Sequence, residues 1–296
     1  MIMLQLKGLG TALITPFLPS GAVDYDGLKR LLDIQLQGGV DYIVVLGTTG
    51  EAATMTEQEK KDVRQFIVRY VSGRLPLVLG FGGNNTAQVV ADLNANKEEL
   101  QRDFAAILSV CPFYNKPSQE GLYQHFTAIA DSSPIPVILY NVPGRTGVNL
   151  LPETVMRIFA DKSDKIMGIK EASGNMDQIK HLIDLVKVRP LSDGRFLLVI
   201  SGDDGIAADV MMAGGAGLIS VAANAWPKEL SQIVRKQDVL LQNRFENMVR
   251  LLFKEGNPSG IKTVLSQRGV IHNVLRLPLV PNSKEVQAEI RSCVCD

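Results

Sequence analysis

The sequence of 296 residues has little cysteine, histidine or tryptophan and no excess of charge of either sign. Its three cysteines, Cys111, Cys293 and Cys295, are an odd number, and two lie at the C-terminal end. We therefore expect no disulfide framework and a reducing, cytoplasmic location. The 31 Lys and Arg residues balance the 31 Asp and Glu residues. No basic excess remains to neutralise phosphates, so we expect no nucleic-acid partner.

Signals for metal, membrane and secretion are also missing. The histidines His125, His181 and His272 stand apart and lack metal-ligand spacing, so we expect no metal. The most apolar long stretch, residues 210–226, is short for a bilayer span, and we interpret it as a helix end, a turn and a buried strand. The opening MIMLQLKGLG lacks a charged segment before a long apolar core, so we expect no signal peptide and no membrane partner.

Short apolar runs, each followed by an amphipathic segment, dominate the chain. The eight runs begin at Thr11, Tyr42, Pro76, Ala105, Pro136, Ile166, Phe196 and Gly217. They are continuous rather than alternating, which is typical of strands buried on both faces. Residues 56–59 have the form of a helix capping box, and apolar residues at 179, 182, 183 and 186 follow a helical period. The pattern predicts an α/β protein with a (β/α)₈ TIM barrel, and an open doubly wound sheet is the alternative.

The C-terminal part of the sequence has a different pattern. After Trp226 the strand-like runs stop, while Leu241, Phe245, Met248 and Leu252 keep a helical period. The sequence Gly-Asn-Pro at 256–258 then breaks that period. We therefore predict a barrel over residues 1–226 and a small all-helical appendage over residues 227–296.

Polar residues at the ends of the predicted strands are the candidates for a site, because barrel active sites lie at the carboxyl ends of the strands. Lys170 lies inside the sixth apolar run, where burial disfavours the charged ammonium form. A neutral amine is what Schiff-base chemistry requires. A lysine that reaches solvent, or that pairs with a carboxylate such as that of Glu171, explains the position equally well.

Two further strand ends carry groups suited to a small carboxylate. The second run leads into Thr48 and Thr49, whose hydroxyls and neighbouring backbone N–H groups suit such an anion, although a simple turn is the alternative. The fifth run ends at Tyr140, a residue type that can carry protons, and is followed by Arg145, which can grip a carboxylate. A core tyrosine and a surface arginine are the simpler interpretation of this pair.

The fourth and seventh strand ends are less specific. Phe113 and Tyr114 follow the fourth run, where packing within the loop is the simplest interpretation. Asp203 and Asp204 follow the seventh run and would repel a phosphate, so a phosphorylated substrate is not expected. Capping of the next helix explains these two carboxylates.

Five segments together resemble the dihydrodipicolinate synthase family, within the pyruvate-dependent class I aldolase and lyase superfamily. They are GTTGE at 47–51, PFYNKPSQEG at 112–121, YNVPGRTG at 140–147, GIKEASG at 168–174 and SGDD at 201–204. The resemblance covers essentially the whole chain. It implies condensation of pyruvate with L-aspartate 4-semialdehyde to 4-hydroxy-tetrahydrodipicolinate, in lysine and diaminopimelate biosynthesis. It also implies a homotetramer, a dimer of dimers, that needs no cofactor.

The resemblance assigns catalytic roles to four residues. Lys170 would form the Schiff base with pyruvate, and Tyr140 matches the family's proton-shuttling tyrosine. Thr49 matches the threonine that links this tyrosine to a second one. Tyr114 matches the second tyrosine, which family members supply from a neighbouring subunit. Hydroxyl groups suit such a relay because each can both donate and accept.

It also assigns residues that bind substrate. Thr48 and Thr49 would hold the carboxylate of pyruvate, and Arg145 would hold the carboxylate of the semialdehyde. Gly202 and Ile219 match positions whose backbone lines the surroundings of the lysine.

Two alternatives remain at this point. N-acetylneuraminate lyases and 2-keto-3-deoxy sugar-acid aldolases share the lysine, the tyrosine and the threonine loop. They differ around Arg145, since a polyol needs hydroxyl partners rather than a carboxylate clamp. A non-catalytic barrel that binds small carboxylates is the other alternative, and it predicts a missing catalytic residue, whereas none is missing.

The resemblance further predicts weak or absent inhibition by L-lysine. Phe113 stands where many bacterial members carry a tyrosine of a lysine feedback site, and Asn84 of that site is retained. Its histidines and glutamate align with Glu57, Lys60 and Gln88. The site therefore lacks a hydroxyl and an acidic partner for the ligand's ammonium groups. Steady-state rates measured with added L-lysine should stay near the uninhibited rate, and inhibition by micromolar lysine would contradict this.

Overall fold

The computed structural model describes residues 6–189 and 196–295, with the side chains of residues 294 and 295 left out. Residues 1–5 of the segment considered for a signal peptide, and the side chain of Cys295, therefore lie outside the described part. Among the described helices, none combines the length and apolarity that a bilayer crossing requires. The described residues contain no group of three or more His, Cys, Asp or Glu side chains placed to hold a metal ion.

Eight parallel strands form a closed barrel in chain order, which confirms the predicted (β/α)₈ fold. The strands are β1 (Gly8–Ala12), β2 (Tyr42–Val45), β3 (Leu77–Gly80), β4 (Ala106–Val110), β5 (Val137–Asn141), β6 (Ile166–Glu171), β7 (Leu198–Ser201) and β8 (Gly217–Ser220). Nearly all of their residues are buried, as continuous β-branched runs predict. The chain divides into two compact units, Met1–Lys7 with Leu77–Leu218 and Gly8–Pro76 with Ile219–Asp296.

The first strand differs from the prediction. We expected it to begin at Thr11, but β1 covers Gly8–Ala12 and the apolar residues that follow are buried without strand structure. The start of this strand was not predicted because it contains two glycines, and glycine is rare inside strands. Gly10 is needed there, since a Cβ atom at this position would lie 2.2 Å from the ring of Tyr42, its partner on β2.

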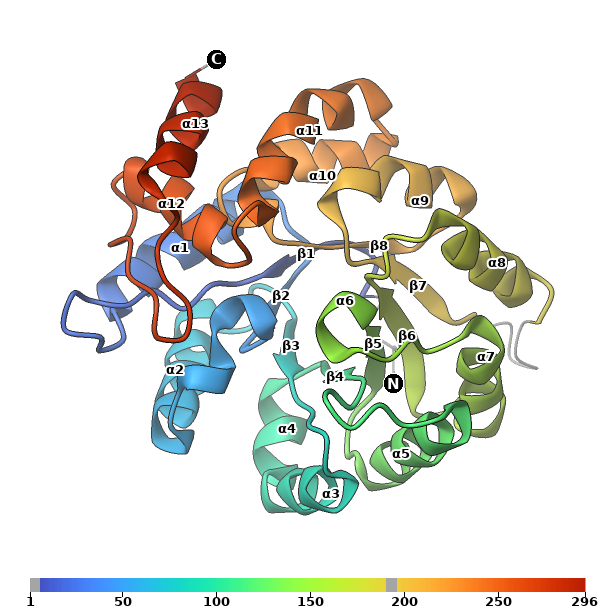
Figure 1. Ribbon diagram of the computed structural model, residues 1–296. Coiled ribbons are helices and arrows are strands. Elements are labelled where there is room, and N and C mark those ends of the chain that lie inside the picture. The colour runs from blue at the N-terminus through green and yellow to red at the C-terminus, as the bar shows by residue number, and fades with distance from the viewer. Residues whose placement is uncertain (1–5, 190–195, 296) are drawn as a thin grey trace. The chain divides into compact units, whose positions relative to one another are not determined.

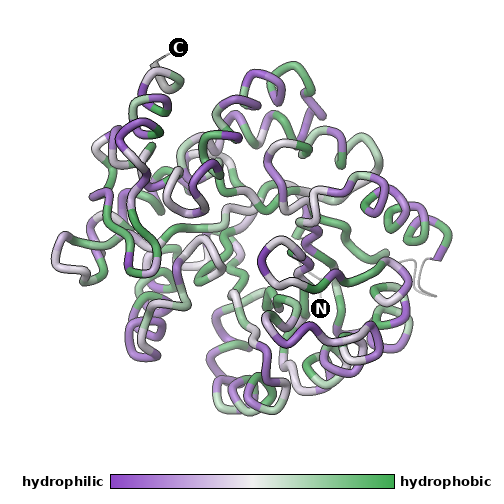
Figure 2. Tube along the Cα trace, viewed as in Figure 1, coloured by the Kyte–Doolittle hydropathy of each residue, from purple (hydrophilic) through white to green (hydrophobic). Residues whose placement is uncertain are grey.

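The first unit contains β3 to β7 and the helices that connect them (Figure 1). The helices are α3 (Thr86–Ala95), α4 (Lys97–Asp103), α5 (Gln119–Ser132), α6 (Pro143–Thr146), α7 (Pro152–Asp161), α8 (Met176–Lys187), the 3₁₀ turn η3 (Asp204–Ile206) and α9 (Ala207–Ala213). Successive helices pack on one another, with α5 against α7, α7 against α8 and α8 against α9. The predicted apolar stripe of α8 is buried, and the helix alternates between hydrophilic and hydrophobic colour in Figure 2.

The second unit contains β1, β2 and the C-terminal helices. Its helical elements are α1 (Tyr25–Gly38), η1 (Thr48–Gly50), η2 (Ala52–Thr54), α2 (Glu57–Val71), η4 (Ala222–Asn224), α10 (Pro227–Lys236), α11 (Val239–Phe253), α12 (Ser259–Gln267) and α13 (Lys284–Cys295). Helix α10 packs on α1 and β1, while α11, α12 and α13 pack on one another. The C-terminal segment is helical as expected, whereas a domain boundary after Trp226 stays a prediction.

Local signals in the sequence account for several element ends. The capping box is confirmed, because Thr56 accepts a hydrogen bond from the Glu59 backbone and the Glu59 side chain accepts one from the Thr56 backbone. The predicted break at 256–258 separates α11 from α12. Residues 210–226 form a helix end, a turn at Gly214 and β8, also as predicted.

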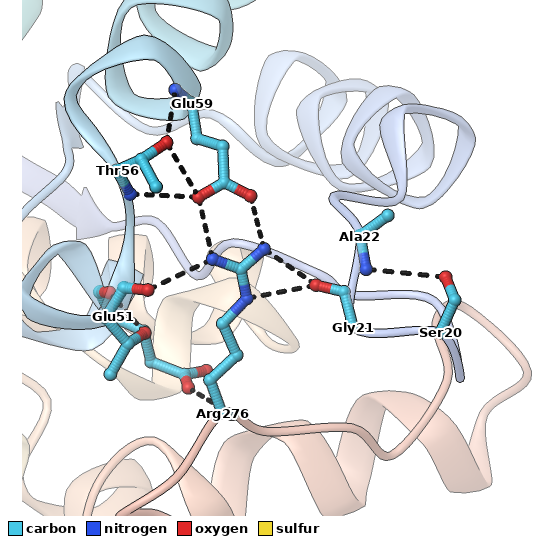
Figure 3. Close-up of polar contacts among 8 residues, drawn as sticks. Ser20, Gly21, Ala22, Glu51, Thr56, Glu59 and Arg276 are labelled. Carbon is cyan, nitrogen blue, oxygen red and sulfur yellow. Dashed lines mark hydrogen bonds and ion pairs between the residues drawn. The ribbon is translucent and has the colours of Figure 1, made fainter.

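Arg276 joins three segments of the second unit (Figure 3). Its guanidinium group donates to both carboxylate oxygens of Glu59 on α2, at 2.5 and 2.9 Å. It also donates to the backbone carbonyl oxygens of Gly21, at 2.7 and 3.0 Å, and of Thr54, at 3.1 Å. The hydrogen bonds from Arg276 lower the pKa of Glu59 to about 2. This one side chain therefore ties the C-terminal segment to α2 and to the loop after β1.

Replacing Glu59 by Gln should lower the free energy of unfolding by about 1–3 kcal/mol at pH 7, because it removes a charge-assisted hydrogen-bond acceptor. The unfolded carboxyl titrates near pH 4.3. A folded pKa below that value makes the contribution complete above about pH 5 and lost as the pH falls toward 2. The difference between wild type and E59Q, measured by urea unfolding, should shrink between pH 7 and about pH 3.

The matched control for this prediction is Glu57→Gln, because the side chain of Glu57 lies in an exposed ion pair with Lys60. That variant should change the free energy of unfolding by less than about 0.5 kcal/mol at either pH. A destabilisation in E59Q that is equal at both pH values would show that the carboxylate's charge is not the source of the effect.

Candidate active site

Lys170 lies at the carboxyl end of β6 and is 6% exposed. Its register partner on β5 is Tyr140. Residues in register on parallel strands point to the same face, and the Lys170 Nζ atom lies 4.4 Å from the centroid of the Tyr140 ring. Burial excludes a lysine that reaches solvent, since such a side chain would be exposed. The structure thus brings together a buried amine and a tyrosine.

A glycine on the next strand end makes room for this lysine. Gly202 directly follows β7, and a Cβ atom at its position would lie 2.9 Å from Cε of Lys170 and 2.6 Å from Cβ of Ala172. Neither contact is tolerated in real structures. Gly202 is therefore a packing neighbour of the lysine side chain, and its role in a substrate site stays a prediction.

Glu171 points to the other face of β6 and has its own partners. Its carboxylate accepts hydrogen bonds from the Asn141 side chain at 3.0 Å, the Ser173 backbone at 2.8 Å and the Gln178 side chain at 3.1 Å. Within the described part of the chain it forms no ion pair with Lys170, which removes that interpretation of the lysine. Because Asn141 ends β5 and Gln178 lies on α8, the network fixes the backbone that carries Lys170.

Arg145 lies on the short helix α6, which begins directly after β5. Its backbone N–H donates to the carbonyl of Val142 at 2.9 Å, and its side chain is exposed. Gly147 ends this helix with a φ of 74°, a conformation that favours glycine. The tight turn therefore holds the Arg145 backbone next to the end of the strand that carries Tyr140.

The loop after β4 presents Tyr114 to solvent. The side chain is 89% exposed, and the residue has a φ of 75°, which is unfavourable for a non-glycine residue. The backbone is held by hydrogen bonds from Tyr114 N–H to the Thr146 carbonyl and from the Asn84 side chain to the Phe113 carbonyl. Packing within the loop, the simplest expectation, is wrong for this ring. A constrained backbone instead exposes it beside the loop that carries α6.

The predicted threonines lie in the second unit, in the turn η1. Thr48 is exposed, whereas Thr49 is 3% exposed and its hydroxyl oxygen accepts a hydrogen bond from the Asn257 side chain at 2.9 Å. Neither threonine caps the next helix, because Thr56 caps α2. Ile219 is buried in β8. Sequence reasoning noted Asn257 only as part of a helix break, and no signal in the sequence connected it with Thr49.

The remaining sequence candidates have structural roles. Asp203 caps η3 by accepting a hydrogen bond from the Gly205 backbone at 2.8 Å, as expected. Burial raises the pKa of the Cys111 thiol, which keeps it protonated in the core. Burial also lowers the pKa of His125 to about 4, so its ring is neutral near pH 7.

Comparison with known proteins points to one family. A sequence model of the dihydrodipicolinate synthetase family matches residues 5–295. A 4-hydroxy-tetrahydrodipicolinate synthase from Parabacteroides distasonis is 48% identical over an alignment of 295 residues. The alignment covers 97% of this chain and 96% of that protein. The match in length and identity extends well beyond the five motifs.

Solved structures agree with the sequence comparison. Dihydrodipicolinate synthase from Thermotoga maritima superposes with a TM-score of 0.91 at 36% identity, covering 98% of each chain. The enzyme from Acinetobacter baumannii, solved in complex with pyruvate, gives a TM-score of 0.90 at 38% identity, again covering 98% of each chain. With the barrel, the buried strand-end lysine and these matches in hand, we conclude that the chain belongs to the dihydrodipicolinate synthetase family.

Proposed function

We propose that the protein is a Schiff-base-forming lyase, the 4-hydroxy-tetrahydrodipicolinate synthase of lysine and diaminopimelate biosynthesis. Its substrates are pyruvate and L-aspartate 4-semialdehyde. The observation that carries the proposal is the buried amine of Lys170 beside the Tyr140 ring and against Gly202. Family membership and the names of the relatives support the choice of substrates.

The chemistry assigned to Lys170 begins when its neutral amine attacks the keto carbon of pyruvate and water leaves. The resulting imine withdraws electrons, so a proton leaves the methyl group and an enamine forms. The enamine carbon then attacks the aldehyde carbon of the semialdehyde, and the aldehyde oxygen takes up a proton. The amino group of the semialdehyde then attacks the imine carbon, which closes the ring and releases the Lys170 amine. Every one of these steps transfers protons, so a donor and acceptor close to the amine is required. The Tyr140 ring, whose centroid lies 4.4 Å from Lys170 Nζ, supports the assignment of this role to Tyr140.

We assign the rest of the proton relay to Thr49 and Tyr114. A hydroxyl group can accept one proton while donating another, which a relay needs. Tyr114 is exposed in its own chain, and its constrained backbone keeps the ring in solvent. We infer that this ring acts in the site of a neighbouring subunit, within a homotetramer formed as a dimer of dimers. The exposure of an aromatic ring on a fixed loop supports this assignment.

The carboxylate groups of the substrates are assigned to three side chains. Thr48 and Thr49 bind the carboxylate of pyruvate through their hydroxyls and the backbone of η1. Arg145 binds the carboxylate of the semialdehyde, since a guanidinium group matches a carboxylate with two parallel hydrogen bonds. Its exposed position on α6 suits a group that meets the second substrate. Gly202 and Ile219 contribute backbone around the lysine. No metal or organic cofactor takes part in this proposal, and the reaction takes place in the cytoplasm.

The test is an assay of the purified protein with pyruvate and L-aspartate 4-semialdehyde, beside parallel reactions with N-acetylneuraminate and with a 2-keto-3-deoxy sugar acid. We expect equal consumption of pyruvate and semialdehyde and no pyruvate released from either sugar acid. Pyruvate release from a sugar acid without semialdehyde consumption would select an aldolase instead. No turnover of any substrate would favour a barrel that only binds carboxylates.

Lys170→Met should lower the condensation rate by at least about a thousandfold, because it removes the nucleophile. Lys180→Met is the matched control, since Lys180 is an exposed lysine on α8. The control should keep the wild-type rate. Retained activity in K170M would overturn the Schiff-base mechanism.

A further inference from the structure

The turn that carries Thr48 and Thr49 has an unfavourable backbone. Leu46, before the turn, and Glu51, after it, both have positive φ values, 54° and 53°. This conformation is unfavourable for any residue other than glycine. The turn has only short-range backbone hydrogen bonds of its own, from Gly50 to Gly47 and from Glu51 to Thr48. Contacts from elsewhere in the second unit must therefore hold it in place.

Those contacts come largely from the C-terminal segment. The carboxylate of Glu51 is fully buried in an ion pair with Lys262 on α12, and it accepts a hydrogen bond from the Arg276 backbone at 3.1 Å. The Lys262 ammonium group also donates to the Val274 carbonyl at 3.0 Å and lies 4.2 Å from the centroid of the Phe17 ring. These contacts anchor the C-terminal end of the turn to α12 and to the segment around Arg276.

Asn257, which lies just before Pro258 and α12, contacts the turn at the hydroxyl group of Thr49. Its side-chain N–H donates to the Thr49 oxygen at 2.9 Å, and both side chains are buried. An amide N–H only donates, so the Thr49 hydroxyl must direct its own proton elsewhere. The hydrogen bond therefore sets both the position of the oxygen and the direction in which the hydroxyl donates.

We infer that Asn257 is a positioning residue for catalysis: its amide group orients the Thr49 hydroxyl, so that the C-terminal helical segment forms part of the working site. The inference rests on the proposed function, because it gives Thr49 a place in the proton relay. It also gives the C-terminal segment a role beyond covering apolar surface.

The decisive variant is Asn257→Asp, which keeps the shape of the side chain. An ionised carboxylate only accepts, so the Thr49 hydroxyl would turn its proton toward position 257 and away from the relay. A protonated carboxyl donates to Thr49 again and restores the original direction. Burial at position 257 disfavours the ionised form of the introduced carboxyl and raises its pKa toward the assay range. The ratio of kcat between N257D and wild type should fall as the pH rises from about 6 to about 9, to on the order of a tenth.

Asn257→Leu separates orientation from simple loss of packing. It removes the donor at every pH, so its kcat should be lower than that of wild type by a factor that does not change with pH. The charged groups Glu51, Lys262 and Arg276 stay in place in both variants, so a pH dependence confined to N257D reports the new carboxyl. Thermal unfolding of each variant shows whether it is folded at the assay temperature.

The matched control is Asn282→Ala. Asn282 is a buried asparagine of the same C-terminal segment, and its side chain bonds Thr263 and Glu255 rather than the turn. This variant should lower the unfolding temperature and leave kcat unchanged across the pH range. A loss of kcat in N282A like that in N257L would mean that any destabilisation of the segment lowers activity, and would overturn the inference.

The remaining outcomes are distinct from a failure of the proposed function. Suppose that wild type turns over both substrates. Asn257 then does not orient Thr49 if the kcat of N257D equals that of wild type at every pH. The same conclusion holds if N257D and N257L lose the same fraction of kcat independently of pH. If wild type does not turn over these substrates, the proposed function itself fails and takes the inference with it.

Discussion

The pairing of β5 with β6 is the constraint on which the rest of the site depends. The register that sets Tyr140 beside Lys170 places a phenol next to a buried amine, and no loop conformation is needed to achieve it. Strands hold their side chains more rigidly than loops, so a lysine and a tyrosine carried by two neighbouring strands are well ordered. On the opposite face, Glu171 bonds Asn141 and Gln178 and keeps the two strand ends together. A shift of one residue in this pairing would send the lysine to the helix side of the sheet.

In the second unit, polar contacts hold the less regular turn η1 in place. The turn η1 follows a strand but leaves strand geometry at once, at the cost of two residues with positive φ. Lys262, Asn257 and Arg276 bond this turn or the residues that follow it, and all three come from the C-terminal segment. A helical appendage far along the sequence therefore determines the shape of a loop near the start of the chain.

Much of the fold could be predicted from the sequence because its signals are local. Continuous β-branched runs revealed the strands, and the Thr56 capping box and the break at 256–258 marked helix ends. The start of β1 was missed, since glycines at positions 8 and 10 lack the apolar signal. A Cβ atom would collide with the Asp41 carboxylate at position 8 and with the Tyr42 ring at position 10. Gly202 was assigned only through the family resemblance. The strand-end rule found Lys170 and Tyr140, which the structure brings together. It could not find Asn257, because the contact with Thr49 joins residues that are 208 positions apart and depends on tertiary packing alone.

The central claim is that Lys170 acts as the nucleophile toward pyruvate. The most direct measurement is the mass of the protein after incubation with pyruvate and borohydride, followed by peptide mapping of the adduct. A Schiff base on Lys170 predicts one reduced pyruvate adduct per chain, on the peptide that contains Lys170. It also predicts that the adduct is lost when L-aspartate 4-semialdehyde is present and consumed. An unmodified protein, or an adduct on the other deeply buried lysine, Lys262, would contradict it.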